Sequence, residues 1–245
     1  MMFKNIYRKI TCYLFHEQFR PSLASIFMNP FYFSRRVLVK NIRHYSANIN
    51  GNVLDIGCGT KPYKDLFNTH SYIGIDTDRS GHNHEFSDVD VFYDGTFIPF
   101  PDNTFDSIVC FEVMEVIFNP DLLLSEANRI LKNGGKALFT VPFVWDEHEQ
   151  PFDYARYSSY GLKYLFEKHG FTVIDNKKYL GDLRLLFLLS NVYIFKVFRR
   201  LIPSKISYVL ILPFTSFNNI IGHIAYLLPR NNDLYFGNIF LLEKK

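Results

Sequence analysis

The sequence predicts an α/β fold in which helices cover both faces of a mostly parallel sheet. Short β-branched runs alternate with helix-patterned segments from about residue 52 onward, which is typical of such a sheet. The length of 245 residues fits one domain of the larger α/β kind, alone or with a capping segment. With 48% hydrophobic and 21% charged residues, the chain can bury a large core.

Seven strands and two well-delimited helices are predicted. The strands are expected at residues 52–56, 71–75, 89–93, 105–110, 136–141, 171–175 and 235–242. Asn119 and Pro120 form a helix start, a capping residue followed by proline at the first helical position, and Gly134 is expected to end this helix. Ser158 or Ser159 is expected to cap the second helix.

Two segments lie outside the predicted sheet. Residues 1–50 are predicted to form a helical arm and carry eight Lys or Arg against one acid, a charge of +7, which leaves −4 for the other 195 residues. Residues 183–230 are apolar and basic without a single acid, and they are far longer than an ordinary strand connection. We therefore expect an N-terminal arm at 1–50, a ligand-binding domain at 51–182 and 231–245, and a helical insertion at 183–230.

Composition excludes several classes of protein. A mean hydropathy of −0.03 is too low for a polytopic transporter. The three cysteines form no CxxC pair, which indicates neither a disulfide framework nor a thiolate zinc site and favours a reducing compartment. Charged residues interrupt every early apolar run, so we expect no secretory signal and a cytoplasmic protein.

A glycine-rich turn follows the first predicted strand. Residues 53–60 read VLDIGCGT, and glycines in such a turn let a ligand press against backbone amides. The third glycine of the dinucleotide fingerprint is missing, because the chain continues from Gly59 as Thr-Lys-Pro-Tyr, and a pyrophosphate would be poorly held. Asp55, at the strand end, suits a cationic amino group. The alternative is a turn that only reverses the chain.

Two further acids end the next strands. Asp76 lies 21 residues beyond Asp55, where a carboxylate can accept both hydroxyls of a ribose. Asp94 follows the third strand and could accept from an exocyclic amine, with Thr96 or Phe97 flanking a purine. Each acid alone could be a turn residue, but three acids at successive strand ends favour a binding site.

Residues 53–141 resemble the class I S-adenosylmethionine-dependent methyltransferases, in particular the broad methyltransferase branch with D-x-G-C-G, a strand-end acid and an L-P-F-x-D-x-x-F-D segment. The resemblance implies a Rossmann-like, doubly wound sheet of seven strands in the order 3-2-1-4-5-7-6, with the last strand antiparallel and the helical insertion before it. It also implies S-adenosylmethionine as cofactor. One departure is Val116, where many relatives have a histidine that could act as a base.

The resemblance also implies roles for individual residues. Asp55, Gly57, Cys58 and Gly59 would meet the methionine part of the cofactor, Asp76 the ribose, and Asp94 with Gly95 the adenine. Phe111 and Glu112 would pass beneath the methionine part and open toward the methyl acceptor.

The loop after the fifth strand is dense in polar side chains: Asp146, Glu147, His148, Glu149, Asp153, Tyr154, Arg156 and Tyr157. The loop lies at the carboxyl edge of the predicted sheet, where open α/β folds bind ligands. We expect an acceptor site in which His148 or Asp153 is the catalytic base. Glu149, Tyr154, Arg156 and Tyr157 would position the acceptor. The alternative is that Arg156 only pairs with an acid of the loop while the tyrosines pack under the next helix.

No metal is expected. His148 with its acidic neighbours lacks the helical spacing of a metal site and a second nearby histidine. His82 and His84, in the stretch GHNHE, are a weaker version of the same pattern and are expected to lie in a solvated loop.

The predicted reaction is methyl transfer to an oxygen, less readily a nitrogen, of a sugar or lipid-linked glycan. The string DEHEQPxDYxRY resembles a branch of these methyltransferases found among bacterial surface-polysaccharide genes. The alternatives are a quinone or other lipid methyltransferase, and a non-catalytic cofactor-binding module in which Val116 marks lost chemistry. Nucleic acid is not an expected partner, because residues 111–114 read FEVM instead of the (D/N)-P-P-(Y/F) tetrad. The oligomeric state stays open.

Residues 183–230 predict peripheral contact with an anionic membrane, at its inner face. Residues 185–195 are too short to span a hydrocarbon core of ~30 Å. Residues 206–228 are long enough but contain Pro213, two asparagines, a glycine and a histidine, which favours a hairpin in the interface over a span. The alternative is that these helices pack on the sheet or on a second subunit.

Overall fold

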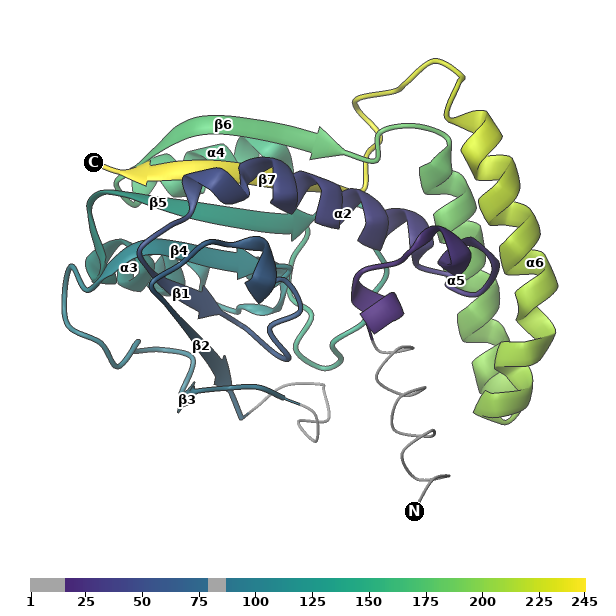
Figure 1. Cartoon of the computed structure of the whole chain (residues 1–245), viewed down its shortest axis with the longest axis horizontal. Coiled ribbons are helices and arrows are strands. Elements are labelled where there is room, and N and C mark those ends of the chain that lie inside the picture. The colour runs from purple at the N-terminus through teal and green to yellow at the C-terminus, as the bar shows by residue number, and fades with distance from the viewer. Residues whose placement is uncertain (1–15, 79–86) are drawn as a thin grey trace. The chain divides into compact units, whose positions relative to one another are not determined.

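The computed structural model describes residues 16–78 and 87–245. These residues divide into two compact units. One contains the described residues up to Lys40 together with Leu180–Tyr235, and the other contains Asn41–Tyr179 with Phe236–Lys245. The first unit thus groups part of the expected N-terminal arm with the expected insertion, and the second unit carries the sheet (Figure 1).

The second unit is built on one sheet, which has seven strands among the described residues. The strands are β1 (Asn52–Ile56), β2 (Ser71–Thr77), β3 (Val91–Tyr93), β4 (Phe105–Phe111), β5 (Leu131–Pro142), β6 (Phe171–Tyr179) and β7 (Gly237–Lys244). Their order is β3-β2-β1-β4-β5-β7-β6, and β7 runs antiparallel to both β5 and β6. The order and the antiparallel strand that the sequence predicted are confirmed (Figure 1).

Several predicted boundaries are wrong by a few residues. Helix α3 (Pro120–Ile130) ends before Gly134, because Leu131 already pairs with Phe105 and begins β5 five residues ahead of the expected start. Residues 132–135 bulge between this pair and the next one in the ladder. The ends of β2, β3, β4, β6 and β7 also differ from the predicted ones by one to four residues.

Helices α3 and α4 (Ser159–Lys168) lie behind the sheet in Figure 1, and their capping residues are those that the sequence predicted. The side chains of Asn119 and Ser158 each accept a backbone N–H of the first helical turn. Phe166 of α4 packs between Phe139 and Phe240, with ring centroids 5.1 and 5.2 Å away, and all three rings are fully buried. Burying each ring stabilises the fold by about 1.5–3 kcal/mol.

The last turn of α2 (Tyr32–Tyr45) also belongs to the second unit. The Tyr45 hydroxyl donates to Asp175 of β6 at 2.7 Å. A short 3-10 helix, η2 (Ser46–Asn48), then leads into β1.

The first unit contains the predicted helical insertion. Its described residues include the larger part of α2, up to Lys40, and the helices η1 (Leu23–Phe27), α5 (Arg184–Leu201) and α6 (Ser204–Ala225). A buried amide network joins α5 to α6: Asn191 accepts from Asn218 at 2.9 Å and donates to Asn219 at 3.1 Å. Asn219 also donates to the backbone oxygens of Ile26 and Asn29, which fixes the N-terminal segment to α6.

Candidate active site

The glycine turn follows β1 at the carboxyl edge of the sheet. Gly57 and Gly59 have φ of +70° and +49°, a left-handed backbone that favours glycine. A Cβ at Gly57 would collide with Val113, whereas a Cβ at Gly59 would meet no atom within 4 Å. Gly59 therefore presents bare backbone to open space, as a turn that receives a ligand must. Cys58, between the glycines, is buried, and burial raises the pKa of its thiol.

Asp55 is buried at the end of β1, with 3% of its surface exposed. The hydroxyl of Tyr72, on the neighbouring strand β2, donates to Asp55 Oδ2 at 2.7 Å. Burial raises the pKa of Asp55 to about 7, against the lowering effect of the Tyr72 hydrogen bond. Near neutral pH this carboxyl is therefore partly protonated, and a cationic group brought beside it would favour the carboxylate.

Asp76 ends β2 and lies directly against the glycine turn. Its Oδ2 accepts the backbone N–H of Gly59 at 2.9 Å, and its Oδ1 accepts that of Thr77 at 2.8 Å. The glycine turn and Asp76, which the sequence analysis expects to bind the same ligand, are thus in direct contact. Only two of the carboxylate's hydrogen-bonding positions are taken by these bonds, and others are left to accept hydroxyls.

Asp94 follows β3 on the surface. Its Oδ1 accepts the backbone N–H groups of Thr96 and Phe97 at 2.8 and 3.1 Å. Hydrogen bonds from the Thr96 side chain and from these N–H groups lower the pKa of Asp94 to about 2, so it is a carboxylate at any physiological pH. Gly95 has φ of +81°, and a Cβ added there would lie 3.5 Å from the side chain of Thr77, which follows Asp76.

Glu112 stands immediately after β4 with φ of +58°, unusual for a residue other than glycine. Its Oε1 accepts the hydroxyl of Tyr179, at the end of β6, at 2.9 Å, and its N–H donates to Thr140. The Phe111 ring packs against Tyr63, with ring centroids 5.4 Å apart. Contacts from β5, from the end of β6 and from the segment after β1 therefore hold this strand end in place.

In the loop after β5, three predicted residues form one cluster. Arg156 donates to both oxygens of Asp153, at 2.5 and 2.7 Å. Asp153 Oδ2 also accepts the backbone N–H of His148 at 3.0 Å and lies 3.1 Å from His148 Nδ1. The Arg156 guanidinium holds the pKa of Asp153 below its usual range. The Asp153 side chain is 3% exposed and that of His148 28% exposed, so the histidine is accessible from solvent whereas the carboxylate is not.

The other predicted acceptor residues have different environments. Glu149 is buried, Tyr154 is 45% exposed, and Tyr157 is partly buried against the core. The backbone N–H groups of Tyr154 and Ala155 both donate to the backbone oxygen of Glu115, at 2.8 and 3.1 Å. The sequence left open that Arg156 only pairs with an acid of the loop and that the tyrosines only pack. In the structure Arg156 does pair with Asp153 and Tyr157 does pack against the core, and His148 also contacts Asp153.

Sequence reasoning missed the partners that hold these acids. Tyr72 and Tyr179 reach Asp55 and Glu112 from neighbouring or distant strands, and no motif points to them. Lys61 has a weak signal in the sequence, because it is a charged residue two positions after Gly59 of the glycine turn. In the structure its φ is +49°. Its buried ammonium pairs with Asp90 at 2.7 Å, which ties the turn to the segment before β3.

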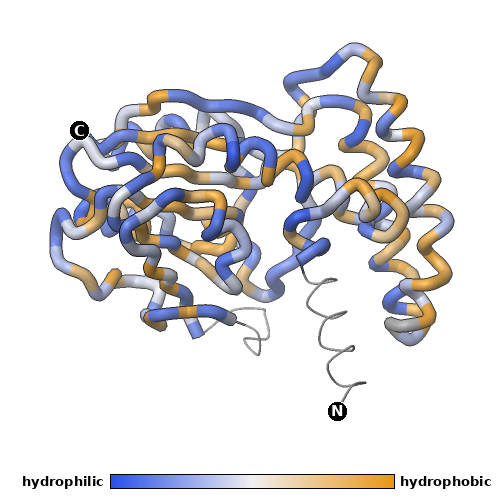
Figure 2. The backbone as a smooth tube through the Cα atoms, viewed as in Figure 1, coloured by the Kyte–Doolittle hydropathy of each residue, from blue (hydrophilic) through white to orange (hydrophobic). Residues whose placement is uncertain are grey.

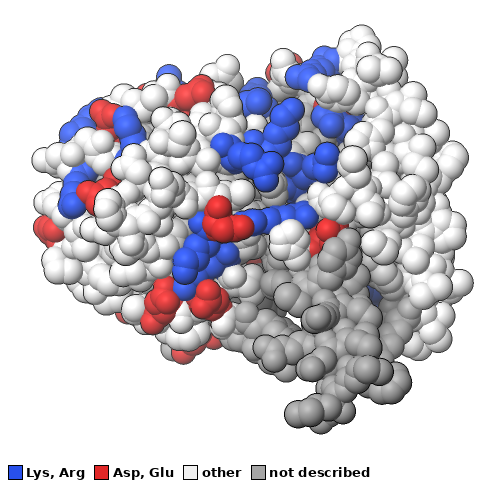
Figure 3. Space-filling model, in the orientation of Figure 1, with Lys and Arg blue, Asp and Glu red and all other residues white. Residues whose placement is uncertain are grey.

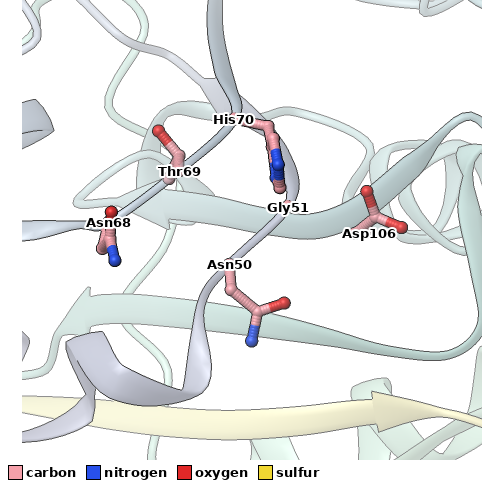
Figure 4. A pocket seen from close by; sticks show the side chains of 6 residues that line it. All are labelled: Asn50, Gly51, Asn68, Thr69, His70 and Asp106. Carbon is pink, nitrogen blue, oxygen red and sulfur yellow. The ribbon is translucent and has the colours of Figure 1, made fainter.

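Among residues 16–78 and 87–245, no group of three His, Cys, Asp or Glu side chains is placed to hold a metal ion. His82 and His84 lie outside the described residues. A polar hollow lined by Asn50, Gly51, Asn68, Thr69, His70 and Asp106 lies at the amino ends of β1, β2 and β4, the edge opposite the glycine turn (Figure 4). This hollow is therefore not part of the candidate site.

A seven-stranded sheet in this order, with a glycine turn after β1 and an acid at the end of β2, defines the class I S-adenosylmethionine-dependent methyltransferase fold. The chain belongs to the methyltransferase domain family, whose model matches residues 31–176. The matched domain is that of S-adenosylmethionine-dependent methyltransferases, and the open backbone of Gly59 beside Asp76 fits such a ligand.

Relatives cover only part of this chain or share only its fold. The fatty-acid O-methyltransferase of Mycolicibacterium smegmatis is 30% identical over 105 residues, 38% of either chain. The matches span about two fifths of the length of the curated relatives. A SAM-dependent methyltransferase from Archaeoglobus fulgidus has a TM-score of 0.55 at 18% identity, covering 95% of this chain and 99% of that one. Phosphoethanolamine N-methyltransferase 2 of Haemonchus contortus has a TM-score of 0.58 at 18% identity, covering 94% and 56%.

Proposed function

We propose that this methyltransferase transfers the methyl group of S-adenosylmethionine to an oxygen of a sugar or lipid-linked glycan. The observation that carries the proposal is the contact between His148 Nδ1 and Asp153 Oδ2, at 3.1 Å. A carboxylate that accepts from one ring nitrogen of a histidine leaves the other nitrogen as a proton acceptor. A hydroxyl loses its proton when it is methylated, so a base at this place favours an oxygen acceptor.

Of the two candidate bases, His148 fits the role better. Asp153 is paired with Arg156 through both oxygens and is 3% exposed, which makes it a weak base that a substrate does not reach. We assign it a positioning role, in which it selects the tautomer of His148 with the proton on Nδ1. In this proposal the acceptor's proton goes to His148 Nε2. Glu149, Tyr154, Arg156 and Tyr157 then shape the acceptor pocket around it.

We propose that S-adenosylmethionine binds to the residues at the carboxyl edge of the sheet. Asp55, Gly57, Cys58 and Gly59 would hold the methionine part, Asp76 the ribose, Asp94 and Gly95 the adenine, and Phe111 with Glu112 would lie beneath the methionine part. When bound, S-adenosylmethionine supplies a methyl group already activated on its sulfonium. The chain's own task is then to align the acceptor, exclude water and remove one proton.

A lipid acceptor is the second candidate. It is favoured by the likeness to the fatty-acid O-methyltransferase of Mycolicibacterium smegmatis, 30% identical over 105 residues. The same loop chemistry would serve a carboxyl or hydroxyl group on a lipid.

A strain that lacks the gene distinguishes a glycan acceptor from a lipid acceptor. We expect one O-methyl ether to disappear from the surface glycan and to return with the wild-type gene but not with a His148→Ala copy. Glycan composition analysis by mass spectrometry measures this. Unchanged glycan ethers together with missing methylated fatty acids or quinones would replace the glycan proposal by the lipid one.

We further propose that the first unit contacts an anionic membrane peripherally. Val209, Phe217 and Ile224 of α6 and Leu227 after it are 61–83% exposed. Figure 2 shows hydrophobic residues all along α6, and Figure 3 shows a surface over α6 almost without charged side chains. Among the described residues, one helix, Ile206–Ala225, is long and apolar enough to cross a membrane by length and composition, and 33% of it is buried. Contiguous exposed apolar surface of this kind favours a lipid or protein partner.

Interfacial contact is favoured over a span for two reasons. The buried amides of Asn191, Asn218 and Asn219 tie α6 to α5 and to the N-terminal segment, so α6 does not stand alone as a spanning helix would. Arg199 and Arg200, at the end of α5, are exposed beside the apolar surface and would meet anionic headgroups, each adding about 1 kcal/mol.

We expect the protein to float with vesicles of anionic lipid in a density gradient and to detach in part at high salt. Replacing Val209, Phe217, Ile224 and Leu227 by Gln should keep it in the soluble fraction, because the apolar contact is removed. The matched control replaces Tyr160 and Tyr164, exposed aromatic residues of α4, by Gln and should float normally. Wild type that never floats but elutes as a dimer would make α6 a contact between subunits instead.

A further inference from the structure

Two aromatic side chains form an exposed pair beside the acceptor loop. The rings of Phe118 and Tyr154 have centroids 5.2 Å apart and an interplanar angle of 72°, an edge-to-face arrangement. Phe118 is 82% exposed and Tyr154 45% exposed. Exposing a phenylalanine to water is unfavourable, so its position at the rim of a candidate substrate site suggests a role in binding.

The backbone beneath the pair is held firmly. Phe118 follows the short helix η5 (Met114–Val116), in which Met114 and Glu115 are fully buried. The backbone oxygen of Glu115 accepts the N–H of Tyr154 at 2.8 Å and that of Ala155 at 3.1 Å. These bonds join the segment after β4 to the loop after β5, so the two rings meet because their backbones are anchored to each other.

The surroundings of the pair combine apolar rings with fixed polar groups. Tyr154 directly follows Asp153. The Asp153 carboxylate accepts hydrogen bonds from Arg156 and contacts the ring of His148. A sugar ring has the matching chemistry, because its C–H face packs on an aromatic ring while the hydroxyls at its rim find hydrogen-bond partners. An acyl chain would find charged groups on one side of the pair, which it cannot satisfy.

We propose that Phe118 and Tyr154 form a stacking platform for a sugar ring of the acceptor, which makes Phe118 a residue that determines acceptor specificity. The inference rests on the proposed function, since it concerns the acceptor of the same site. The platform orients the sugar so that one hydroxyl lies near His148. Phe118 takes no part in the proton transfer and none in cofactor binding.

The test measures sugar binding without turnover. Trp145, the single tryptophan of the chain, lies in the acceptor loop and reports binding by its fluorescence. With S-adenosylhomocysteine present, methyl glycosides of common hexoses and 6-deoxyhexoses are titrated into wild type, Phe118→Ala, Phe118→Tyr and Phe118→Leu. The control is Tyr164→Ala, which removes an aromatic side chain that is 69% exposed on α4.

We expect Phe118→Ala to weaken glycoside binding about three- to tenfold, Phe118→Leu nearly as much, and Phe118→Tyr and Tyr164→Ala to bind like wild type. Unchanged affinity for S-adenosylhomocysteine would establish that each variant is folded. If Phe118→Ala binds the glycosides as tightly as wild type, the platform is wrong while the glycan acceptor stands. If wild type binds decanoate but none of the glycosides, the glycan acceptor itself is wrong, and the platform with it.

Discussion

Replacing His148 by alanine should lower turnover ~10²-fold or more while the dissociation constant of S-adenosylhomocysteine stays near the wild-type value. The reason is that His148 is the proposed base: its Nδ1 lies beside Asp153, and within residues 16–78 and 87–245 its polar contacts are with Asp146 and Asp153 of the acceptor loop. Turnover is measured as labelled methyl transferred from S-adenosylmethionine to the lipid-linked glycan fraction. Calorimetry measures the affinity for S-adenosylhomocysteine.

The control for this prediction lies two residues away. Gln150 is exposed and its side chain donates to Glu147, which has no proposed part in the reaction, so Gln150→Ala should turn over normally. Asp153→Asn should also slow turnover, because the amide holds neither His148 nor Arg156 as the carboxylate does. Normal turnover of His148→Ala would show that alignment alone suffices for methyl transfer and that this loop is structural.

Replacing Asp55 by asparagine should stabilise the folded protein above pH 7. Burial raises the pKa of Asp55 to about 7, whereas an unfolded Asp titrates near 3.8. As the pH rises from about 4 to above 7, the unfolded chain therefore releases this proton first, and the folded wild type loses stability across that window. At 1.36 kcal/mol per unit, the loss is at most about 4 kcal/mol.

The Asp55→Asn variant lacks this titration, and its amide oxygen can still accept the Tyr72 hydroxyl. Urea unfolding at pH 8 should thus give a higher unfolding free energy than wild type, while at pH 4 the two should be alike. Asp94→Asn is the control, because the pKa of Asp94 is lowered to about 2 and its effect is confined to acid below about pH 4. Parallel stability profiles of wild type and Asp55→Asn from pH 4 to 8 would contradict the assignment. The same variant should bind S-adenosylmethionine weakly, since the amino group loses its charged partner.

The local pattern of strands, glycine turn and strand-end acids predicted the elements, and the resemblance to class I methyltransferases that this pattern carries implied the strand order, which the structure confirms. Asp55, Gly57 and Asp76 each stand within a few residues of the strand that positions them, so their places at one edge followed from the order of the strands. The end of α3 could not be predicted from the sequence. Leu131 leaves the helix to pair with Phe105, and helix propensity does not encode such a long-range contact.

The sequence predicted which residues belong to the candidate site, but it did not predict which of them contact one another. The sequence offered His148 and Asp153 as equivalent bases, and only the bidentate contact from Arg156 separates them. Tyr72 reaches Asp55 from the adjacent strand β2, and that contact depends on the register in which the two strands pair. Phe118 lay in a stretch without a motif, and its contact with Tyr154 joins segments that are far apart in the chain.

The position of β7 has a consequence for how the chain folds. Strand β6 pairs with β7 alone, and β7 follows it only after residues 180–236. During synthesis β5 and β6 thus remain open edges until the last strand emerges and is inserted between them. Open strand edges can pair with other chains, and closing so long a connection slows folding. The nascent chain is therefore most exposed to aggregation in the interval before β7 is made, while α5 and α6 are being synthesised.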